Sequence, residues 1–262
     1  MSTELLLHER QSIIRKRLAD KGRVIATDLA REFSISEDTI RRDLREMAAA
    51  GLCKRVYGGA LPATLEEDNS LLNRLSIKPE RKDALAKAAV AGFRPGMTLF
   101  IDAGTTNLAI AQAIPDELAL TVITNAPVVA AALLDRRNIN VIMIGGQLER
   151  KSGAVLGSRA MQDAANFHPD ICVLGSCGID IDSGVTASFY EEAEFKRFIS
   201  TQSRKVMAAV TNDKLGVPTP FAVIPLGGCS TVIIEHDADP AMVKAIAGQG
   251  IALVRAGAPR KA

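Results

Sequence analysis

The chain has 262 residues, of which 47% are hydrophobic and 24% are charged. This length allows two domains and this composition allows a buried core, which excludes an intrinsically disordered protein. The longest apolar run, 126–134, is too short to span a bilayer. The N-terminus lacks the basic segment and the cleavage site of a secretory signal. We therefore expect a cytoplasmic protein that does not enter a membrane.

Cysteine and histidine positions exclude two common kinds of site. The 4 cysteines lie in unrelated contexts, and no two of the 3 histidines are four residues apart. Neither a disulfide framework nor a zinc site is predicted, so we expect free thiols in packed cores and no metal ion. Net charge is only +2, but residues 1–62 carry 12 Lys and Arg against 9 Asp and Glu, whereas residues 63–262 carry 20 against 21. The N-terminal excess weakly favours nucleic acid as a partner.

The N-terminal part has the pattern of three short helices. Apolar spacing predicts a first helix over 5–20. Thr27 is expected to cap a second helix over 28–33, and Ser36 a third over 37–50 that carries acidic residues in its first turn. The second and third helices are joined by a turn of few residues. This arrangement is typical of a helix-turn-helix.

The third predicted helix has one apolar and one basic face. Its apolar residues recur at helical spacing and should face the core, which turns Arg41, Arg42 and Arg45 toward solvent. Arginine hydrogen bonds to guanine edges and to phosphate oxygens, so this helix is predicted to enter the major groove of double-stranded DNA. Thr39 is close enough to reach a base or a phosphate. The alternative is an ordinary solvated face, with the arginines paired to acidic residues one turn away.

Residues 52–57 alternate roughly as a strand and end at Gly58 and Gly59. They predict a small basic hairpin beside the third helix, with Arg55 as a DNA contact. Three helices followed by such a hairpin form a winged helix-turn-helix.

Residues 23–60 resemble the N-terminal signature of the DeoR family of bacterial transcriptional regulators. The most diagnostic parts are TIRRDL at 39–44 and GGA at 58–60. The resemblance implies operator contacts from Ser36, Thr39, Arg41 and Arg42.

A polar stretch over 63–78, with a hinge at 61–70, is predicted to link a domain over 1–62 to a domain over 79–262. In the second domain helices and strands alternate, which predicts a Rossmann-like α/β fold with a parallel sheet and helices on both faces. Strands are expected over 98–102, 120–124, 140–144, 171–176, 205–210, 231–235 and 251–255. Helices are expected over 80–92, 107–114, 127–135, 161–166, 190–203 and 240–248.

Ligands of such sheets bind beyond the carboxyl ends of the strands. After the first strand, Gly104 lets backbone N–H groups approach an anion, while Thr105 and Thr106 supply hydroxyls. This favours phosphate; the alternative is that the loop only turns the chain and caps the next helix. The loop matches neither the Walker-A loop nor the GxGxxG fingerprint of nucleotide-binding proteins. No nucleotide cofactor is therefore predicted, and no other cofactor is predicted either.

Other strand ends and the helix over 190–203 add further candidates. Backbone amides and Lys214 could neutralise a phosphate if these ends converge, while Asp102 and Glu192 accept hydrogen bonds from hydroxyls. The remaining candidate effector-binding residues are Asn125, Gly146 and Gly178.

The C-terminal part also resembles the effector domain of the DeoR family, whose fold is similar to ribose-5-phosphate isomerase and glucosamine-6-phosphate deaminase. The matching stretches are 100–106, 122–125, 142–148 and 190–197. Effectors of the family are typically phosphorylated sugars or polyols, glycerol 3-phosphate among them, so the resemblance implies such an effector. Many members carry Asp-x-Ser-Lys where this chain has Thr211 to Lys214, with Asp213 in place of serine. This departure leaves the identity of the effector open.

The sequence is therefore compatible with two functions. The first is a DNA-binding regulator, expected to be a repressor although the sequence does not decide against activation. It should form a homo-oligomer, a dimer or a tetramer, because one recognition helix reads few base pairs. The second is a sugar-phosphate isomerase or deaminase with an accessory N-terminal domain, for which Asp102, Asp180 or Asp182 would be the general base.

Overall fold

The computed structural model describes residues 7–21, 24–50, 52–56, 58–62 and 71–258. The chain divides into two compact units, Met1–Asn69 and Ser70–Ala262. This division falls inside the predicted linker. Among the described helices, none combines the length and the apolar character that a membrane crossing requires.

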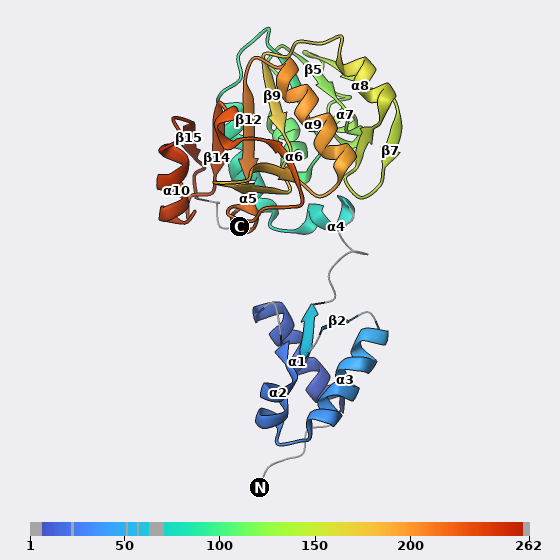
Figure 1. Ribbon diagram of the computed structural model, residues 1–262. Coiled ribbons are helices and arrows are strands. Elements are labelled where there is room, and N and C mark those ends of the chain that lie inside the picture. The colour runs from blue at the N-terminus through green and yellow to red at the C-terminus, as the bar shows by residue number, and fades with distance from the viewer. Residues whose placement is uncertain (1–6, 22–23, 51, 57, 63–70, 259–262) are drawn as a thin grey trace. The chain divides into compact units, whose positions relative to one another are not determined.

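The N-terminal unit is a winged helix-turn-helix, as predicted (Figure 1). Its helices are α1 (Leu7–Lys21), α2 (Ala26–Phe33) and α3 (Glu37–Ala49). A three-stranded sheet of order β1-β3-β2 completes it, with β1 (Val24–Ile25), β2 (Cys53–Val56) and β3 (Gly59–Pro62). Its core is built from the apolar faces of all three helices, and the largest fully buried side chains are Ile14, Leu29, Ile40, Leu44 and Met47.

The start of α2 differs from the prediction that Thr27 caps this helix. The helix begins at Ala26, and the cap position belongs to Ile25, whose side chain makes no capping hydrogen bond. The reason is that β1 runs directly into the helix, so the wing supplies the acceptor. The backbone N–H of Ala26 donates to the carbonyl oxygen of Gly58 at 2.8 Å.

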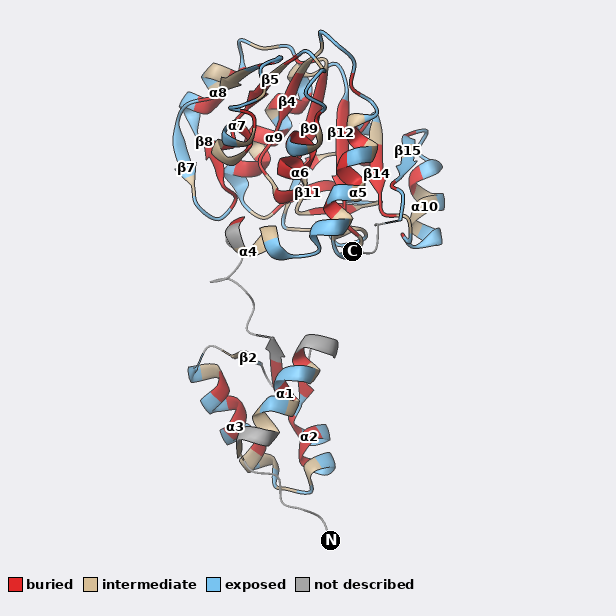
Figure 2. Ribbon diagram, turned by 180° about the vertical axis from the view of Figure 1, so that it is seen from behind, coloured by how far each residue is buried: buried red, intermediate tan, exposed pale blue. Residues whose placement is uncertain are grey.

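The C-terminal unit is built on a seven-stranded parallel sheet of order β15-β14-β12-β9-β4-β5-β6. These strands are β4 (Thr98–Ile101), β5 (Leu120–Thr124), β6 (Ile139–Met143), β9 (Ile171–Leu174), β12 (Val206–Val210), β14 (Thr231–Ile234) and β15 (Ala252–Arg255). All seven were predicted, with bounds shifted by at most two residues. The adjacent strands β9 and β12 are buried along their whole length (Figure 2), as expected for parallel strands covered on both faces.

Helices cover both faces of this sheet (Figures 1 and 2). From β4 the chain moves one way through the sheet, to β5 and β6, and from β9 it moves the other way, to β12, β14 and β15. Because such crossovers are right-handed, the helices of the two halves lie on opposite faces. The helices are α5 (Pro79–Val90), α6 (Thr105–Ala113), α7 (Pro127–Ala132), α8 (Ser158–Ala164), α9 (Tyr190–Gln202) and α10 (Pro240–Ala247).

Several short elements were not predicted. A hairpin joins β7 (Gln147–Glu149) to β8 (Ala154–Leu156), and a second small sheet contains β10 (Gly178–Asp180), β11 (Gly184–Ala187) and β13 (Phe221–Ile224). The structure also has a short helix, α4 (Leu71–Ser76), inside the stretch predicted as a linker. Residues 63–70 of the expected hinge lie outside the described residues.

Candidate functional site

The exposed face of α3 carries the three predicted arginines. Arg41, Arg42 and Arg45 are exposed, whereas the apolar residues of the opposite face are buried. Arg41 pairs with Glu37 at 2.9 Å, and Arg42 lies 3.7 Å from Glu46. Both pairs are solvent-exposed and are therefore worth little, about 0–1 kcal/mol. The ion pairs expected for a solvated face are thus present. They are weak enough that a DNA phosphate could replace the acidic side chains as partners of the guanidinium groups.

The N-terminal end of α3 is closed by a pair of hydroxyls. Ser36 caps the helix as predicted: its Oγ accepts a hydrogen bond from the backbone N–H of Thr39 at 3.1 Å. The two side-chain hydroxyls also lie 2.9 Å apart. Arg55 is exposed on β2 of the wing. The six predicted DNA contacts therefore lie on two elements, α3 with its cap and the wing.

A buried ion pair that sequence reasoning missed fixes α3 in the unit. Asp43 is 2% exposed. Its carboxylate accepts hydrogen bonds from Arg10 of α1 at 2.7 and 3.1 Å. The pair links the first helix to the third. The sequence signal was an acidic residue on the apolar side of an arginine-rich helix, where only a partner can compensate its burial.

In the C-terminal unit a cavity lies where the chain direction changes between β4 and β9. Its walls include residues 103–107 after β4 and 175–177 after β9. Opposite crossover directions leave a crevice at the carboxyl ends of such a strand pair, which is where ligands bind in open α/β sheets. Asn107 fixes this crevice, because its Nδ2 donates to the carbonyl oxygens of Asp102 and Val173 at 2.9 and 3.0 Å.

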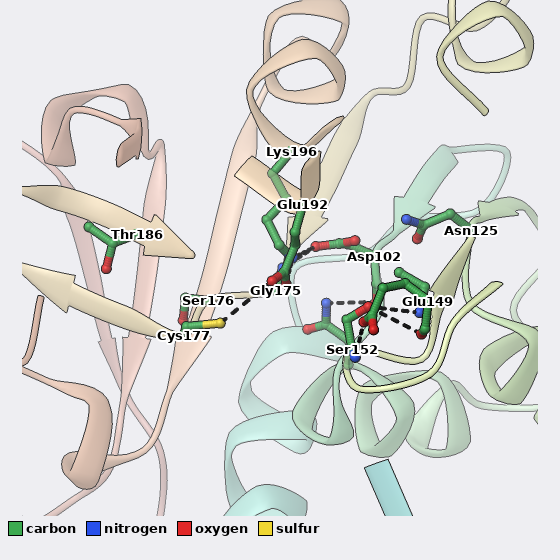
Figure 3. A network of polar contacts seen from close by, with 12 residues as sticks. Asp102, Asn125, Glu149, Ser152, Gly175, Ser176, Cys177, Thr186, Glu192 and Lys196 are labelled. Carbon is green, nitrogen blue, oxygen red and sulfur yellow. Dashed lines mark hydrogen bonds and ion pairs between the residues drawn. The ribbon is translucent and has the colours of Figure 1, made fainter. Parts of the chain in front are cut away.

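A buried charged triad forms one wall of the cavity (Figure 3). Lys196 of α9 donates to the carboxylate of Asp102, which directly follows β4, and lies 3.3 Å from Glu192 one helical turn away. Burial opposes the charge on Lys196, but attraction to Asp102 and Glu192 outweighs it and raises the pKa of the lysine above its ordinary value. Asp102 also accepts from the backbone N–H of Gly175 at 2.9 Å.

Glycine is required at position 175 by this close approach. A Cβ there would lie 2.3 Å from the carbonyl oxygen of Ala103 and 2.9 Å from the carboxylate of Asp102. Any other residue would push the ends of β4 and β9 apart. The triad therefore depends on a glycine that the sequence shows only as part of a turn.

The first turn of α6 forms a second wall. Gly104 precedes the helix at φ 141°, a conformation that L side chains rarely adopt, and Thr105, Thr106 and Asn107 follow it in the cavity lining. The first N–H groups of a helix have no acceptor within the helix, and Gly104 has no side chain to cap them. Together with the threonine hydroxyls they form a set of donors suited to an anion.

Cations gather at the same cavity. Lys214 follows β12 and donates to the carbonyl oxygen of Ser176 at 3.0 Å, and Arg74 of α4 also lines the cavity. Burial lowers the pKa of Lys214 below its ordinary value; attraction to Cys177 and Asp213 opposes this shift, and repulsion from Arg74 and Lys196 adds to it. An anion in the cavity would relieve this repulsion.

The predicted effector residues fall into two groups. Gly104, Thr105, Thr106, Glu192 and Lys214 line the cavity, and Asp102 holds the lysine of the triad. The other three do not line it. Asn125 is buried and donates to the carbonyl oxygen of Val155 at 3.4 Å, Gly146 lies against Val155 and Leu156, and Gly178 begins β10 and pairs with Thr186.

Sequence reasoning missed Arg74, Ser152 and Lys196, which all line the cavity. Lys196 had a signal, since it stands four residues after Glu192 in one predicted helix and therefore on the same face. Arg74 and Ser152 lie in segments without a regular period, so no local pattern pointed to them.

The replacement of serine by Asp213 does not bring a carboxylate into the cavity lining. Asp213 forms an ion pair with Lys78 at 3.1 Å. Burial would raise the pKa of Asp213, but its hydrogen bond with Lys78 lowers it below the ordinary value. Besides this pairing, Asp213 attracts Lys214 of the cavity wall, so its charge is shared between Lys78 and Lys214.

Two of the three carboxylates proposed for an enzyme, Asp102 and Asp180, lack the setting of a general base. Asp102 is bound by Lys196 and Gly175. Asp180 accepts backbone N–H groups of Asp182 and Ser183 at 3.0 and 2.9 Å in a hairpin turn. These bonds, with Ser183 contributing most, lower the pKa of Asp180, whereas a base working near neutral pH needs a raised one.

The four cysteines are free thiols, as expected. Cys53, Cys172 and Cys229 are buried, and Cys177 is half-buried beside Glu192, at 3.9 Å from its carboxylate. Burial raises the pKa of Cys229 to about 12. Among the residues that the structure describes, no group of three or more His, Cys, Asp or Glu side chains is placed to hold a metal ion.

Two family models match the chain. Residues 10–64 match the DeoR-like helix-turn-helix domain, and residues 77–236 match the DeoR C terminal sensor domain. Similar solved structures include ribose 5-phosphate isomerase A from Methanocaldococcus jannaschii, with 13% identity over 52% of this chain and 54% of that chain and a TM-score of 0.39. That similarity is too partial to support an argument about this chain.

Curated relatives agree with the family models. The glycerol-3-phosphate regulon repressor of Escherichia coli (strain K12) is 33% identical over 233 residues, which are 88% of this chain and 91% of that protein. The HTH-type transcriptional regulator GolR of Listeria innocua is 30% identical over 93% of this chain and 96% of that protein. These relatives are regulators, so the enzyme hypothesis is set aside. The chain belongs to the DeoR family of transcriptional regulators, with a helix-turn-helix domain followed by a sensor domain.

Proposed function

We propose that this protein represses a carbohydrate or polyol catabolic operon and is released from double-stranded operator DNA by a phosphorylated sugar or polyol. The observation that carries the proposal is that the first turn of α6, Lys214 and Glu192 line one cavity. Helix N–H groups and a lysine complement a phosphate, while a carboxylate accepts hydrogen bonds from hydroxyls. The similarity to the glycerol-3-phosphate regulon repressor of Escherichia coli supports an effector of this class.

In this proposal the phosphate lies against Gly104, Thr105, Thr106 and Lys214. Glu192 accepts hydrogen bonds from the hydroxyls. Asp102 holds Lys196 in place and does not itself touch the effector, since its carboxylate is already bound by Lys196 and Gly175.

The N-terminal unit binds DNA through α3 in the major groove. Arg41, Arg42 and Arg45 contact base edges and phosphates, Arg55 contacts the backbone from the wing, and the hydroxyls of Ser36 and Thr39 reach phosphates at the helix start. These roles agree with the exposure of all four arginines.

Assembly and release complete the proposal. A homo-oligomer presents two recognition helices to spaced half-sites, which gives the operator a matching symmetry. The effector weakens DNA binding by binding better to the arrangement that does not fit the operator. A tenfold loss of operator affinity needs about 1.4 kcal/mol of coupling.

The test measures the anisotropy of labelled double-stranded fragments from the region around the gene, first without metabolites at low salt. The wild-type chain should bind one fragment, and phosphorylated sugars or polyols should release it while their unphosphorylated forms do not. Replacing both Arg41 and Arg42 with alanine should abolish binding, because both guanidinium groups contact the operator in this proposal. Arg159→Ala, on α8 of the C-terminal unit, is the matched control and should bind normally. A wild-type chain that binds no fragment contradicts the proposal.

A further inference from the structure

The short helix α4 belongs both to the cavity wall and to the path of the chain between the two units. It begins at Leu71, directly after residues 63–70, which join the units in sequence. Arg74, in the middle of the helix, lines the cavity. Any change in how Arg74 is held therefore acts on the first helix after the linker.

The guanidinium group of Arg74 is only partly satisfied. One terminal nitrogen donates to the carbonyl oxygens of Lys151 and Ser152 at 2.8 and 3.3 Å. Its Nε is buried and has no hydrogen-bond partner among the described residues. A buried donor without an acceptor is unfavourable, so a ligand oxygen at this position would satisfy it.

Positively charged side chains near Arg74 also favour the binding of an anion. The carbonyl oxygen of Arg74 accepts a hydrogen bond from Lys82, which is buried, and the side chains of Lys214 and Lys196 line the same cavity as Arg74. Burial lowers the pKa of Lys82, and repulsion from Lys214 and Arg74 lowers it further. Attraction to Asp213 offsets part of this repulsion at Lys82 and Lys214, but the same carboxylate also pairs with Lys78 at 3.1 Å.

The position of α4 depends on parts of the cavity wall. Leu71 is buried and packs against Gly153. A Cβ added to Gly153 would lie 2.8 Å from the Cδ2 atom of Leu71. Gly153 belongs to the turn after Glu149, whose carboxylate accepts the backbone N–H groups of Lys151 and Ser152 (Figure 3). α4 also contacts α6, whose first turn lines the cavity.

We propose that Arg74 is a ligand of the effector's phosphate group, a phosphate monoester dianion, and that α4 conveys occupancy of the cavity to the linker. Nε donates to one phosphate oxygen while Lys214 and the first turn of α6 hold the others. The bound anion thereby fixes α4 against the turn at 149–153 and against α6. This inference rests on the proposed function, since it assumes a phosphorylated effector that controls DNA binding.

The first experiment measures binding of inorganic phosphate and of glycerol 3-phosphate to the full chain by calorimetry. Arg74→Gln should weaken the binding of both by about 10- to 100-fold, the effect of losing a hydrogen bond to a charged group, and Arg74→Lys should weaken it less. Arg159→Gln removes an arginine that is 73% exposed on α8 and should change nothing. Unfolding curves without ligand show whether each variant is folded.

The second experiment follows hydrogen exchange of backbone amides in peptides covering 63–78. Saturating glycerol 3-phosphate should slow exchange in the wild-type chain and in Arg159→Gln. In Arg74→Gln, saturated at higher concentration, exchange should stay fast and the DNA fragment should stay bound.

The outcomes separate the two proposals. If glycerol 3-phosphate binds the wild-type chain and releases DNA, but Arg74→Gln behaves as Arg159→Gln does, the role of Arg74 is overturned and the proposed function stands. If the ligand binds with unchanged exchange over 63–78, the role of α4 is overturned. A wild-type chain that binds neither inorganic phosphate nor glycerol 3-phosphate overturns the role of Arg74 as a phosphate ligand, whereas the proposed function fails only if no phosphorylated sugar or polyol releases the operator fragment.

Discussion

Replacing Lys196 with methionine should strongly destabilise the C-terminal unit. The lysine side chain is 2% exposed and lies between the carboxylates of Asp102 and Glu192, which are also buried. Removing one partner of a buried ion pair costs about 3–5 kcal/mol, because the other partner keeps its charge without water or a counter-ion. Here two carboxylates lose the same cation, while methionine keeps most of the side-chain volume. We therefore expect a loss in the upper part of that range.

The loss should vary with pH in a defined direction. Burial opposes the charge on Lys196, but Asp102 and Glu192 raise its pKa above the ordinary value. A raised pKa in the folded state gives stabilisation that is complete below the unfolded value of about 10.4 and is lost as the pH rises through the folded value. The difference between the wild type and Lys196→Met should therefore be constant near neutral pH and shrink in strong alkali.

The assay is urea unfolding of the full chain, followed by far-UV circular dichroism, with the transition of the C-terminal unit fitted separately. Lys205→Met removes an exposed lysine and should change the free energy of unfolding by less than about 0.5 kcal/mol. Adding Asp102→Asn to Lys196→Met removes one orphaned charge and should restore at least about 1 kcal/mol. If Lys196→Met is as stable as Lys205→Met, the ion-pair reasoning is refuted.

Three further results are expected. Asp43→Ala should lower the stability of the N-terminal unit by about 2 kcal/mol, because Arg10 loses its buried partner but keeps some access to water, and calorimetry should show this unit melting earlier with the C-terminal transition unmoved. Thr105→Val should weaken the response to effector without changing operator affinity in its absence; an unchanged response in the anisotropy assay would remove this residue from the site. Iodoacetamide at pH 8 should label Cys177 in the native chain, and bound effector should slow this labelling. Mass spectrometry should show that Cys229, whose pKa is about 12, stays unlabelled. Equal labelling of both cysteines would contradict the burial argument.

Much of the fold could be predicted because its long elements carry their own periodicity. Residues 120–124 form a strand with the predicted bounds, and the apolar spacing in α3 gave its buried face correctly. The strands β7, β8, β10, β11 and β13 were missed, since they pair only in small antiparallel sheets outside the parallel sheet and are defined by those partners more than by any local pattern. The start of α2 was wrong for the same reason: its first N–H is satisfied by Gly58, far along the chain.

Prediction of the site was limited because it depends on the order of the strands within the sheet. Candidates were taken from the ends of five of the seven strands, but the cavity forms where β4 and β9 are neighbours and the chain leaves in opposite directions. Asn125 and Gly146 follow β5 and β6, on the far side of that point. Sequence gives the order of strands along the chain, whereas their order in the sheet depends on tertiary packing, so the sequence could not separate these residues from Gly104 or Lys214.

Arg74 shows most clearly why part of the site escapes local patterns. It stands in a polar stretch with the composition of a linker, and its contact with Lys151 spans 77 residues of sequence. Yet a regulator needs some contact of this kind. A ligand can shift an equilibrium only through contacts that differ between its two states, and a phosphate held solely by the rigid sheet edge would bind both states equally. In our proposal Arg74 makes the two affinities for phosphate differ, because it lies on α4, the first helix after the linker, and its contact with the phosphate depends on the position of that helix.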